Sequence, residues 1–199
     1  PFYDAAIERA TRASRKRSLS ALGEVPGRVL LAGVGTGLDL PHLPPTHHYV
    51  GLDLNQAMLR RALPRAGHVD FVPVQGDAQR LPFADASFDC AVLHLILAVV
   101  PQPAHCFAEV ERVLKPGGLI FLIAPSRGPE HRYPQDCWRF YPDGYRALAR
   151  FGGCELLEVS TDWEPHPEEW SGPWGDTVGV FRGRGLSLAQ RMGLMVMRR

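Results

Sequence analysis

The sequence predicts an α/β protein with a doubly wound, mostly parallel sheet that carries helices on both faces. Two observations support this fold class: short apolar runs alternate with helical patterns, and the first run ends directly in a glycine-rich turn. Parallel neighbours need a crossover long enough to hold a helix, so the sustained alternation favours a parallel sheet. The chain has 199 residues, of which 45% are hydrophobic, and we expect a single domain over residues 1–199.

The first half of the chain is expected to begin with a helix and to continue into alternating strands and helices. Between Asp4 and Leu22, small and apolar residues recur at helical spacing opposite a basic face. The tandem prolines Pro44 and Pro45 stop a short helix after the glycine turn. The predicted elements are a helix over 4–22, strands over 28–32, 49–54 and 69–74, and helices over 38–43 and 55–63.

The second half repeats the alternation before its pattern loosens. Predicted strands cover 88–95, 119–124 and 155–161, and predicted helices cover 103–114 and 141–151. Gly117 and Gly118 are expected to end the first of these helices. Residues 163–184 are rich in Trp, Pro and Gly and are expected to form a long loop, followed by a final strand over 192–197.

Composition and charge narrow the classes of function. Lys and Arg total 22 against 21 Asp and Glu, and the net charge of +1 gives no reason to expect nucleic acid as a partner. The 4 cysteines form no CxxC pair, and the histidines show no pairing suited to a metal, so we expect no metal site. Because no apolar run is long enough to span a bilayer and no leader is evident, we expect a cytoplasmic protein.

The most informative segment is the glycine turn Gly33-Val34-Gly35-Thr36-Gly37, which follows the first strand. Asp53 ends the next strand, about 20 positions after the first glycine, where a carboxylate reaches the ribose of a nucleotide lying over the turn. A dinucleotide-binding fingerprint places its third glycine five positions after the first, and this chain has Leu38 there. The spacing therefore disfavours a nicotinamide or flavin cofactor.

Five segments in order resemble the motifs of class I S-adenosylmethionine-dependent methyltransferases, which have a Rossmann-like fold. They are residues 29–37, 50–59, 75–83, 88–92 and 113–118. The stretch from Gly33 to Pro41 is especially similar to the subset that contains ubiquinone-biosynthetic and bacterial phospholipid methyltransferases. The resemblance covers roughly residues 28–125, the expected cofactor-binding core. It implies S-adenosylmethionine as cofactor and in-line methyl transfer to a small-molecule acceptor, with a lipid or a quinone-like molecule as options.

The resemblance also implies roles for the residues of the first two motifs. Gly33, Gly35 and Gly37 would let the backbone approach the methionine part of the cofactor. Asp53 would accept hydrogen bonds from both ribose hydroxyls, because a carboxylate offers two acceptor oxygens.

Further roles are implied for residues in the later motifs and beside Asp53. Asp77 would accept from the adenine amino group, while the amide of Ala78 meets the ring. Leu54 and Met58 would pack on the adenine face, with a place in the core as the alternative for Met58. His94, at the end of the fourth strand, would face the reacting sulfonium as the candidate catalytic residue, and the alternative is a histidine satisfied by structural hydrogen bonds.

One position departs from the family pattern. Family members usually carry Asp or Glu two places before the first glycine, where it helps to hold the cationic end of the cofactor, and this chain has Leu31. Losing such a bond, on the order of 1.5–3 kcal/mol, weakens binding roughly ten- to a hundredfold unless another group substitutes. The departure motivates an alternative function, a module that binds S-adenosylmethionine or its demethylated product without turnover.

The acceptor side is expected from the helical cap of residues 1–27 and from residues 126–199. Residues 131–141 are rich in aromatic and hydrogen-bonding side chains, and they either wall a substrate cleft or staple a helix to the sheet. The basic face of the first helix, which includes Arg15, is expected to be solvated. Contact with anionic lipid is the less favoured alternative, because the apolar side is mostly alanine and would insert weakly.

Overall fold

The computed structural model describes residues 2–130, 136–161 and 175–185. The strands predicted as far as Thr161 are all present, with boundaries that shift by a few residues. The elements in chain order are α1 (Phe2–Leu19), η1 (Ser20–Leu22), β1 (Arg28–Ala32), η2 (Leu40–His42), β2 (His48–Asp53), α2 (Gln56–Ala62), η3 (Leu63–Ala66), β3 (Asp70–Gln75), β4 (Phe88–His94), α3 (Ile96–Val99), α4 (Pro103–Val113), β5 (Leu114–Arg127), α5 (Pro142–Gly152), β6 (Glu155–Thr161) and β7 (Gly175–Arg182).

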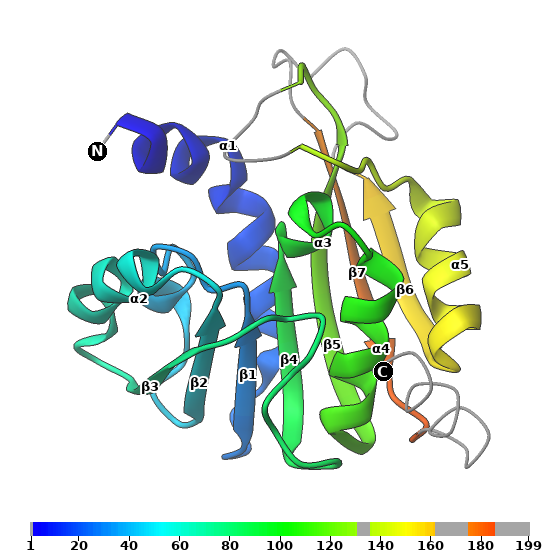
Figure 1. The fold of residues 1–199 in the computed structure, drawn as a ribbon, viewed down its shortest axis with the longest axis horizontal. Helices are drawn as coiled ribbons and strands as arrows, with labels where there is room; N and C mark the ends of the chain where they lie inside the picture. The colour runs from blue at the N-terminus through cyan, green and yellow to red at the C-terminus, as the bar shows by residue number, and fades with distance from the viewer. Residues whose placement is uncertain (1, 131–135, 162–174, 186–199) are drawn as a thin grey trace.

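The strands form one seven-stranded sheet in the order β3-β2-β1-β4-β5-β7-β6 (Figure 1). β1 to β5 pair in parallel, and β7 lies antiparallel between β5 and β6. The predicted fold class is therefore confirmed. The strand order reverses beside β1, because the chain crosses from β3 at the edge back to β4. In open α/β sheets this reversal places the ligand site at the carboxyl ends of the neighbouring strands.

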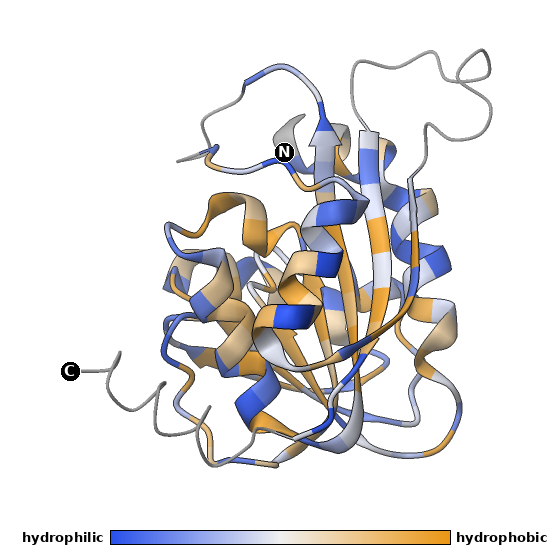
Figure 2. Ribbon diagram, turned by 90° about the vertical axis from the view of Figure 1, so that its right-hand side faces the viewer, coloured by the Kyte–Doolittle hydropathy of each residue, from blue (hydrophilic) through white to orange (hydrophobic). Residues whose placement is uncertain are grey.

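Helices cover both faces of this sheet, and side chains within one strand alternate between the two covers. In β1, Leu30 joins the apolar cluster beneath α4 and α5, whereas Leu31 joins the cluster beneath α1 and α2. In Figure 1, α4 and α5 lie on the near side of the sheet and α1 crosses behind it. The central strands are hydrophobic along much of their length (Figure 2), as expected of a sheet that is buried on both faces.

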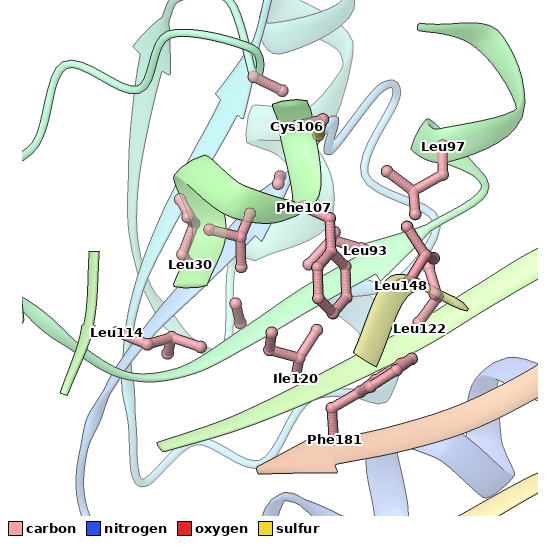
Figure 3. Close-up of a cluster of buried hydrophobic side chains, with 14 of the residues drawn as sticks. Leu30, Leu93, Leu97, Cys106, Phe107, Leu114, Ile120, Leu122, Leu148 and Phe181 are labelled. Carbon is pink, nitrogen blue, oxygen red and sulfur yellow. The ribbon is translucent and has the colours of Figure 1, made fainter. Parts of the chain in front are cut away.

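The cluster beneath α4 and α5 joins the added antiparallel strand to the parallel part of the sheet. Phe107 of α4 points toward Phe181 of β7 (Figure 3), and both side chains are fully buried. Their rings meet edge to face with centroids 5.0 Å apart, a favoured aromatic geometry. Burial of each such side chain contributes about 1.5–3 kcal/mol, so this contact helps to hold β7 in the sheet.

The prediction of a loop over residues 163–184 is wrong in its last part, because Gly175–Arg182 forms β7. Thr177, Val178 and Phe181 are strand-forming residues, but Gly179 interrupts their run and obscures the pattern. The glycine is needed where it stands, since a Cβ at this position would lie 2.6 Å from the Tyr145 ring. Residues 163–174 and the strand predicted over 192–197 lie outside the described residues.

Two boundary predictions are also corrected. The helix predicted over 38–43 is reduced to η2, a single 3-10 turn with proline at its start. Gly117 and Gly118 do not end α4, which stops at Val113, and they lie instead within β5. The Gly117 amide donates to the Gly183 carbonyl at 2.7 Å, and the Gly183 amide donates to the Gly118 carbonyl at 2.8 Å, so this stretch pairs with the residue that follows β7.

Candidate cofactor and active site

β1 ends in a turn whose three glycines all adopt left-handed backbone conformations. The φ angles are +71° at Gly33, +56° at Gly35 and +79° at Gly37, which glycine adopts without the strain that a side chain would bring. The amides of Gly33 and Val34 both donate to the Leu52 carbonyl, at 2.8 and 3.0 Å. The turn is thereby tied to the end of β2.

The three glycines are needed for different reasons. A Cβ at Gly33 would lie 2.6 Å from the Ile96 side chain, and one at Gly37 would lie 2.6 Å from the Leu40 side chain. A Cβ at Gly35 would meet no described atom closer than 4.0 Å. Gly33 and Gly37 therefore let the protein pack on itself, whereas Gly35 leaves its backbone open to a ligand.

Asp53 ends β2 directly beside Gly35. Its Oδ2 accepts from the Gly35 amide at 2.8 Å, and its Oδ1 accepts from the Asn55 amide at 2.8 Å. Each carboxylate oxygen can accept a further hydrogen bond, so this half-buried side chain keeps capacity for two hydroxyl donors. Leu54 is 70% exposed and Met58 is half-buried, so both leave apolar surface outside the core.

Asp77 and Ala78 follow β3, the strand that pairs with β2. The Gly76 amide donates to the Asp53 carbonyl at 3.0 Å, which joins the two loops. Asp77 Oδ1 accepts from the Gln79 amide at 2.8 Å, and the Ala78 side chain is buried. The fold thus brings Gly35, Asp53 and Asp77 to adjacent strand ends, which sequence spacing alone suggested only in part.

His94 ends β4 on the face that α1 covers, and its side chain is 1% exposed. Nδ1 lies 2.7 Å from Asp39 Oδ1, and Nε2 lies 3.0 Å from Ser18 Oγ. Both ring nitrogens are therefore occupied by protein atoms, as the alternative of a structural histidine requires. Contact of His94 with the sulfonium stays a prediction.

Asp39 follows the glycine turn and binds Arg15 as well as His94. Arg15 Nη1 of α1 donates to the same Oδ1 at 2.6 Å. Burial alone would raise the pKa of Asp39, but His94 and Arg15 together outweigh burial and hold the pKa well below its usual range. Arg15 is 5% exposed, so its assignment to a solvated basic face is wrong. The buried carboxylate draws it inward.

The first turns of α1 also contact the segment around the glycine turn. The Thr36 hydroxyl donates to Asp4 at 3.1 Å, and Arg65 donates both to Asp4, at 2.8 Å, and to the Thr36 carbonyl. Glu8 Oε1 lies 3.3 Å from His42 Nε2. α1 therefore lies against residues 36–42 and borders the candidate site directly.

Residues 136–141 return from the end of β5 past α3. Phe140 is buried in the core cluster, and its amide donates to the Pro125 carbonyl at 2.8 Å. Trp138 donates from Nε1 to the Val100 carbonyl at 3.0 Å, yet its side chain stays 43% exposed. Phe140 thus staples this segment to the sheet, whereas Trp138 leaves aromatic surface open. Residues 131–135 lie outside the described residues.

Comparison with known proteins identifies the family. Residues 30–122 match a family model described as a methyltransferase domain. A ubiquinone/menaquinone biosynthesis C-methyltransferase of Syntrophotalea carbinolica is 32% identical over 186 residues, covering 90% of this chain and 76% of that protein. The chain belongs to the class I S-adenosylmethionine-dependent methyltransferases. The resemblance carried by the five motifs is confirmed.

A further relative agrees with the family, and a solved structure agrees with the fold. A phosphatidylethanolamine N-methyltransferase of Cereibacter sphaeroides is 34% identical over 135 residues, covering 64% of this chain and 66% of that protein. The chain spans only about a third to two thirds of the length of the first curated relatives that it matches. A solved chain from the complex of the Haloferax volcanii Trm112 activator with a putative methyltransferase has a TM-score of 0.76 and 23% identity, covering 93% and 94% of the two chains.

The cofactor of this methyltransferase family is S-adenosylmethionine, and the residues at the strand ends fit it. The open backbone at Gly35 suits close approach of a ligand, and the free acceptor capacity of Asp53 suits a pair of ribose hydroxyls. Leu31 offers no such fit, since its side chain is 1% exposed within the apolar cluster beneath α1. Sequence reasoning missed the pairing of Asp39 with Arg15, because their 24-residue separation carries no local signal.

Proposed function

We propose that this chain transfers a methyl group from S-adenosylmethionine to a small, largely apolar acceptor. The observation that carries the proposal is the junction of Gly35 and Asp53, where an accessible backbone and a carboxylate with spare acceptor capacity meet at 2.8 Å. Asp77 stands on the adjacent loop, one residue after the backbone bond that joins the two loops. This arrangement lies at the reversal of strand order, where ligands of open α/β sheets bind.

The protein's part in the reaction is binding and orientation. S-adenosylmethionine would supply a methyl group carried on a sulfonium. The leaving group is then a neutral thioether. Gly35 admits the methionine part, Asp53 holds the ribose, and Asp77 with the Ala78 amide reads the adenine. Leu54 and Met58 cover the ring. Alignment of the two reactants is the principal source of acceleration, because well-oriented reactants reach effective concentrations of about 10⁵–10⁸ M.

The acceptor is proposed to be a lipid or a quinone-like molecule. Relatives named for phosphatidylethanolamine and for ubiquinone/menaquinone biosynthesis support this class. The residues that follow β4 support it too, because Leu95 and Ile96 are half-buried and apolar and Ile96 lies against Gly33 of the glycine turn. These relatives are methyltransferases, and nothing in them favours the alternative of a binding module without turnover.

The cellular location and the binding partners of the protein are also part of the proposal. Within the residues described, no helix is both long enough and apolar enough to cross a bilayer. We place the protein in the cytoplasm with a small molecule as its partner, without nucleic acid. A lipid acceptor would be met at a membrane surface.

The proposal is tested first by calorimetry with S-adenosylmethionine and S-adenosylhomocysteine. Both are expected to bind, and Asp53→Ala is expected to weaken binding by about 1.5–3 kcal/mol through loss of a charged acceptor. Asp89→Ala is the matched control, since Asp89 also accepts from a backbone amide, that of Arg28 at 2.9 Å, but at the opposite end of the sheet. Absence of binding by both ligands at millimolar concentration would reject the function.

The acceptor class is tested by transfer of a radiolabelled methyl group. Demethylated quinols, phosphatidylethanolamine vesicles and a water-soluble amine are incubated with the protein and labelled cofactor. Label is expected in an apolar acceptor. Transfer to the soluble amine alone would overturn the acceptor class while leaving the methyltransferase assignment intact.

A further inference from the structure

We propose that Asp39 is a positioning residue of the methyl-transfer site, which ties α1 and the end of β4 to the segment that follows the glycine turn. The inference rests on the proposed function, because it assigns a role within that site. It adds a residue to which the five family motifs gave no role.

Asp39 joins three parts of the fold through one oxygen atom. Its Oδ1 accepts from Arg15 of α1 at 2.6 Å and from His94 of β4 at 2.7 Å. The side chain of Asp39 is 7% exposed, that of Arg15 is 6% exposed and that of His94 is 1% exposed, so water does not compete for these hydrogen bonds. Charge-assisted bonds of this length are the strong ones among protein hydrogen bonds.

The network continues from both partners of Asp39 back into α1. Arg15 Nε donates to the Thr11 hydroxyl at 2.8 Å, and His94 Nε2 lies 3.0 Å from the Ser18 hydroxyl. Thr11, Arg15 and Ser18 follow one another at spacings of four and three residues, so they share one face of the helix. α1 is therefore held along more than one turn.

The network also fixes the orientation of the His94 ring. An ionised carboxylate only accepts, so the proton between His94 and Asp39 belongs to Nδ1. When the ring is neutral, Nε2 then accepts from the Ser18 hydroxyl. His94 can neither rotate nor exchange its tautomer without breaking a buried bond.

The position of Asp39 transmits this anchoring to the cofactor site. Backbone bonds run from Gly37 to Val34 at 2.9 Å and from Leu40 to Gly37 at 3.1 Å, so Asp39 lies within the same continuous turn as Gly35. A shift of Asp39 would move that turn relative to Asp53. Buried ion pairs add little stability compared with apolar packing, so precise placement is the effect that this one is suited to provide.

The test compares Asp39→Asn with the double variant Asp39→Asn/Arg15→Gln. The single variant keeps the shape of the side chain but leaves the Arg15 charge without its counter-ion, whereas the double variant removes that charge as well. S-adenosylhomocysteine affinity is measured by calorimetry, stability by urea unfolding, and the exposure of α1 by amide hydrogen exchange. Tyr145→Phe is the control, because it removes a buried hydrogen bond to Thr177 on the other face of the sheet.

Asp39→Asn is expected to weaken S-adenosylhomocysteine binding by roughly tenfold, as when partners that orient a ligand-binding group are removed. It should also speed exchange in α1. The double variant should recover stability without recovering affinity or the slow exchange of α1. Tyr145→Phe should lose stability at unchanged affinity.

Recovery of affinity together with stability in the double variant would overturn the positioning role, since Asp39 would then only balance a charge. Unchanged affinity and unchanged α1 exchange in Asp39→Asn would overturn it as well. Failure of the wild type to bind S-adenosylhomocysteine would reject the proposed function instead. In that case the α1 exchange of the unliganded variants still tests the anchoring.

Discussion

At the scale of single residues, the glycine turn shows that one repeated residue type serves two purposes. All three glycines have positive φ, but only Gly35 faces open space. The space that a side chain at Gly33 would need is occupied by Ile96, and the corresponding space at Gly37 is occupied by Leu40 and Ala62. The motif therefore combines a structural requirement with a binding requirement, and substitution separates the two.

Gly35→Ala is expected to fold with a modest loss of stability, about 1–2 kcal/mol for a left-handed alanine. It should bind S-adenosylhomocysteine much more weakly, because its methyl group enters the ligand space. Gly37→Ala should lose about 1–3 kcal/mol more, because its Cβ also collides with Ala62. Urea unfolding measures both losses. Equal destabilisation by the two substitutions would contradict the distinction.

Leu31 is a second position whose role follows from its immediate neighbours. The family carboxylate would stand here on a strand between Gly51 of β2 and Val92 of β4, inside an apolar cluster. The surroundings thus suit leucine, which makes the residue a structural member of the core. We therefore expect recognition of the cationic end of the cofactor to come from other groups of the site.

Leu31→Glu is therefore expected to weaken binding of S-adenosylmethionine and of its neutral counterpart alike. An unpaired carboxylate buried here should destabilise the fold by about 3–5 kcal/mol. Leu31→Met is the control and should remain within about 1.5 kcal/mol of wild type. Calorimetry with both ligands decides the matter, since selective tightening of the cationic cofactor would show that the leucine merely omits a ligand contact.

At the scale of elements, β7 is the strand that the sequence pattern missed, and α1 is the helix whose buried face the pattern did not reveal. β7 lies between β5 and β6 and is held from α5 by Tyr145, whose hydroxyl donates to the Thr177 carbonyl at 2.5 Å. The same ring occupies the space above Gly179. A single aromatic side chain thus contacts β7 both through its hydroxyl and through its ring.

Tyr145→Phe is expected to lower the free energy of unfolding by about 1–3 kcal/mol, because a buried carbonyl loses its partner. The ring is retained, so packing against Gly179 should survive and near-ultraviolet circular dichroism should stay native-like. Urea unfolding gives the loss. A variant as stable as wild type would show that another donor replaces the hydroxyl.

At the scale of the whole molecule, a buried carboxylate far from the glycine turn makes stability depend on pH. Glu111 of α4 is 1% exposed, and neither of its oxygens makes a hydrogen bond of good geometry. Burial raises its pKa from 4.5 to about 7, and backbone amides at Gly185 and Arg184 offset only part of this effect. The folded state therefore holds this proton more tightly than the unfolded state.

This linkage sets the sign of the expected pH dependence. A raised folded-state pKa stabilises the fold below the unfolded value, and that stabilisation is lost as pH rises from 4.5 through about 7. Glu111→Gln keeps the shape of the protonated acid and cannot ionise. Its stability relative to wild type should increase across this range, and urea unfolding at several pH values would show it. A difference that stays constant with pH would refute the assignment.

Much of the fold and the cofactor half of the site could be predicted from the sequence. The strands of residues 28–94 are read from local apolar runs, and Gly35, Asp53 and Asp77 occupy motif positions at strand ends. The acceptor half could not be predicted in the same way. α1, which borders the site, reaches it through contacts between residues far apart in the chain, such as that of Arg15 with Asp39.

The sequence by itself determined the parallel α/β class, the glycine turn and the place of Asp53 beside that turn, because these depend on periodicity and on spacing within a single crossover. Only the tertiary structure decided the roles of Leu31, Arg15 and His94. The role of a buried side chain depends on which neighbours exclude water from it and on which charged groups it contacts. Arg15 is a surface residue by helical pattern, and it becomes a buried anchor because Asp39, 24 residues away, lies beneath it.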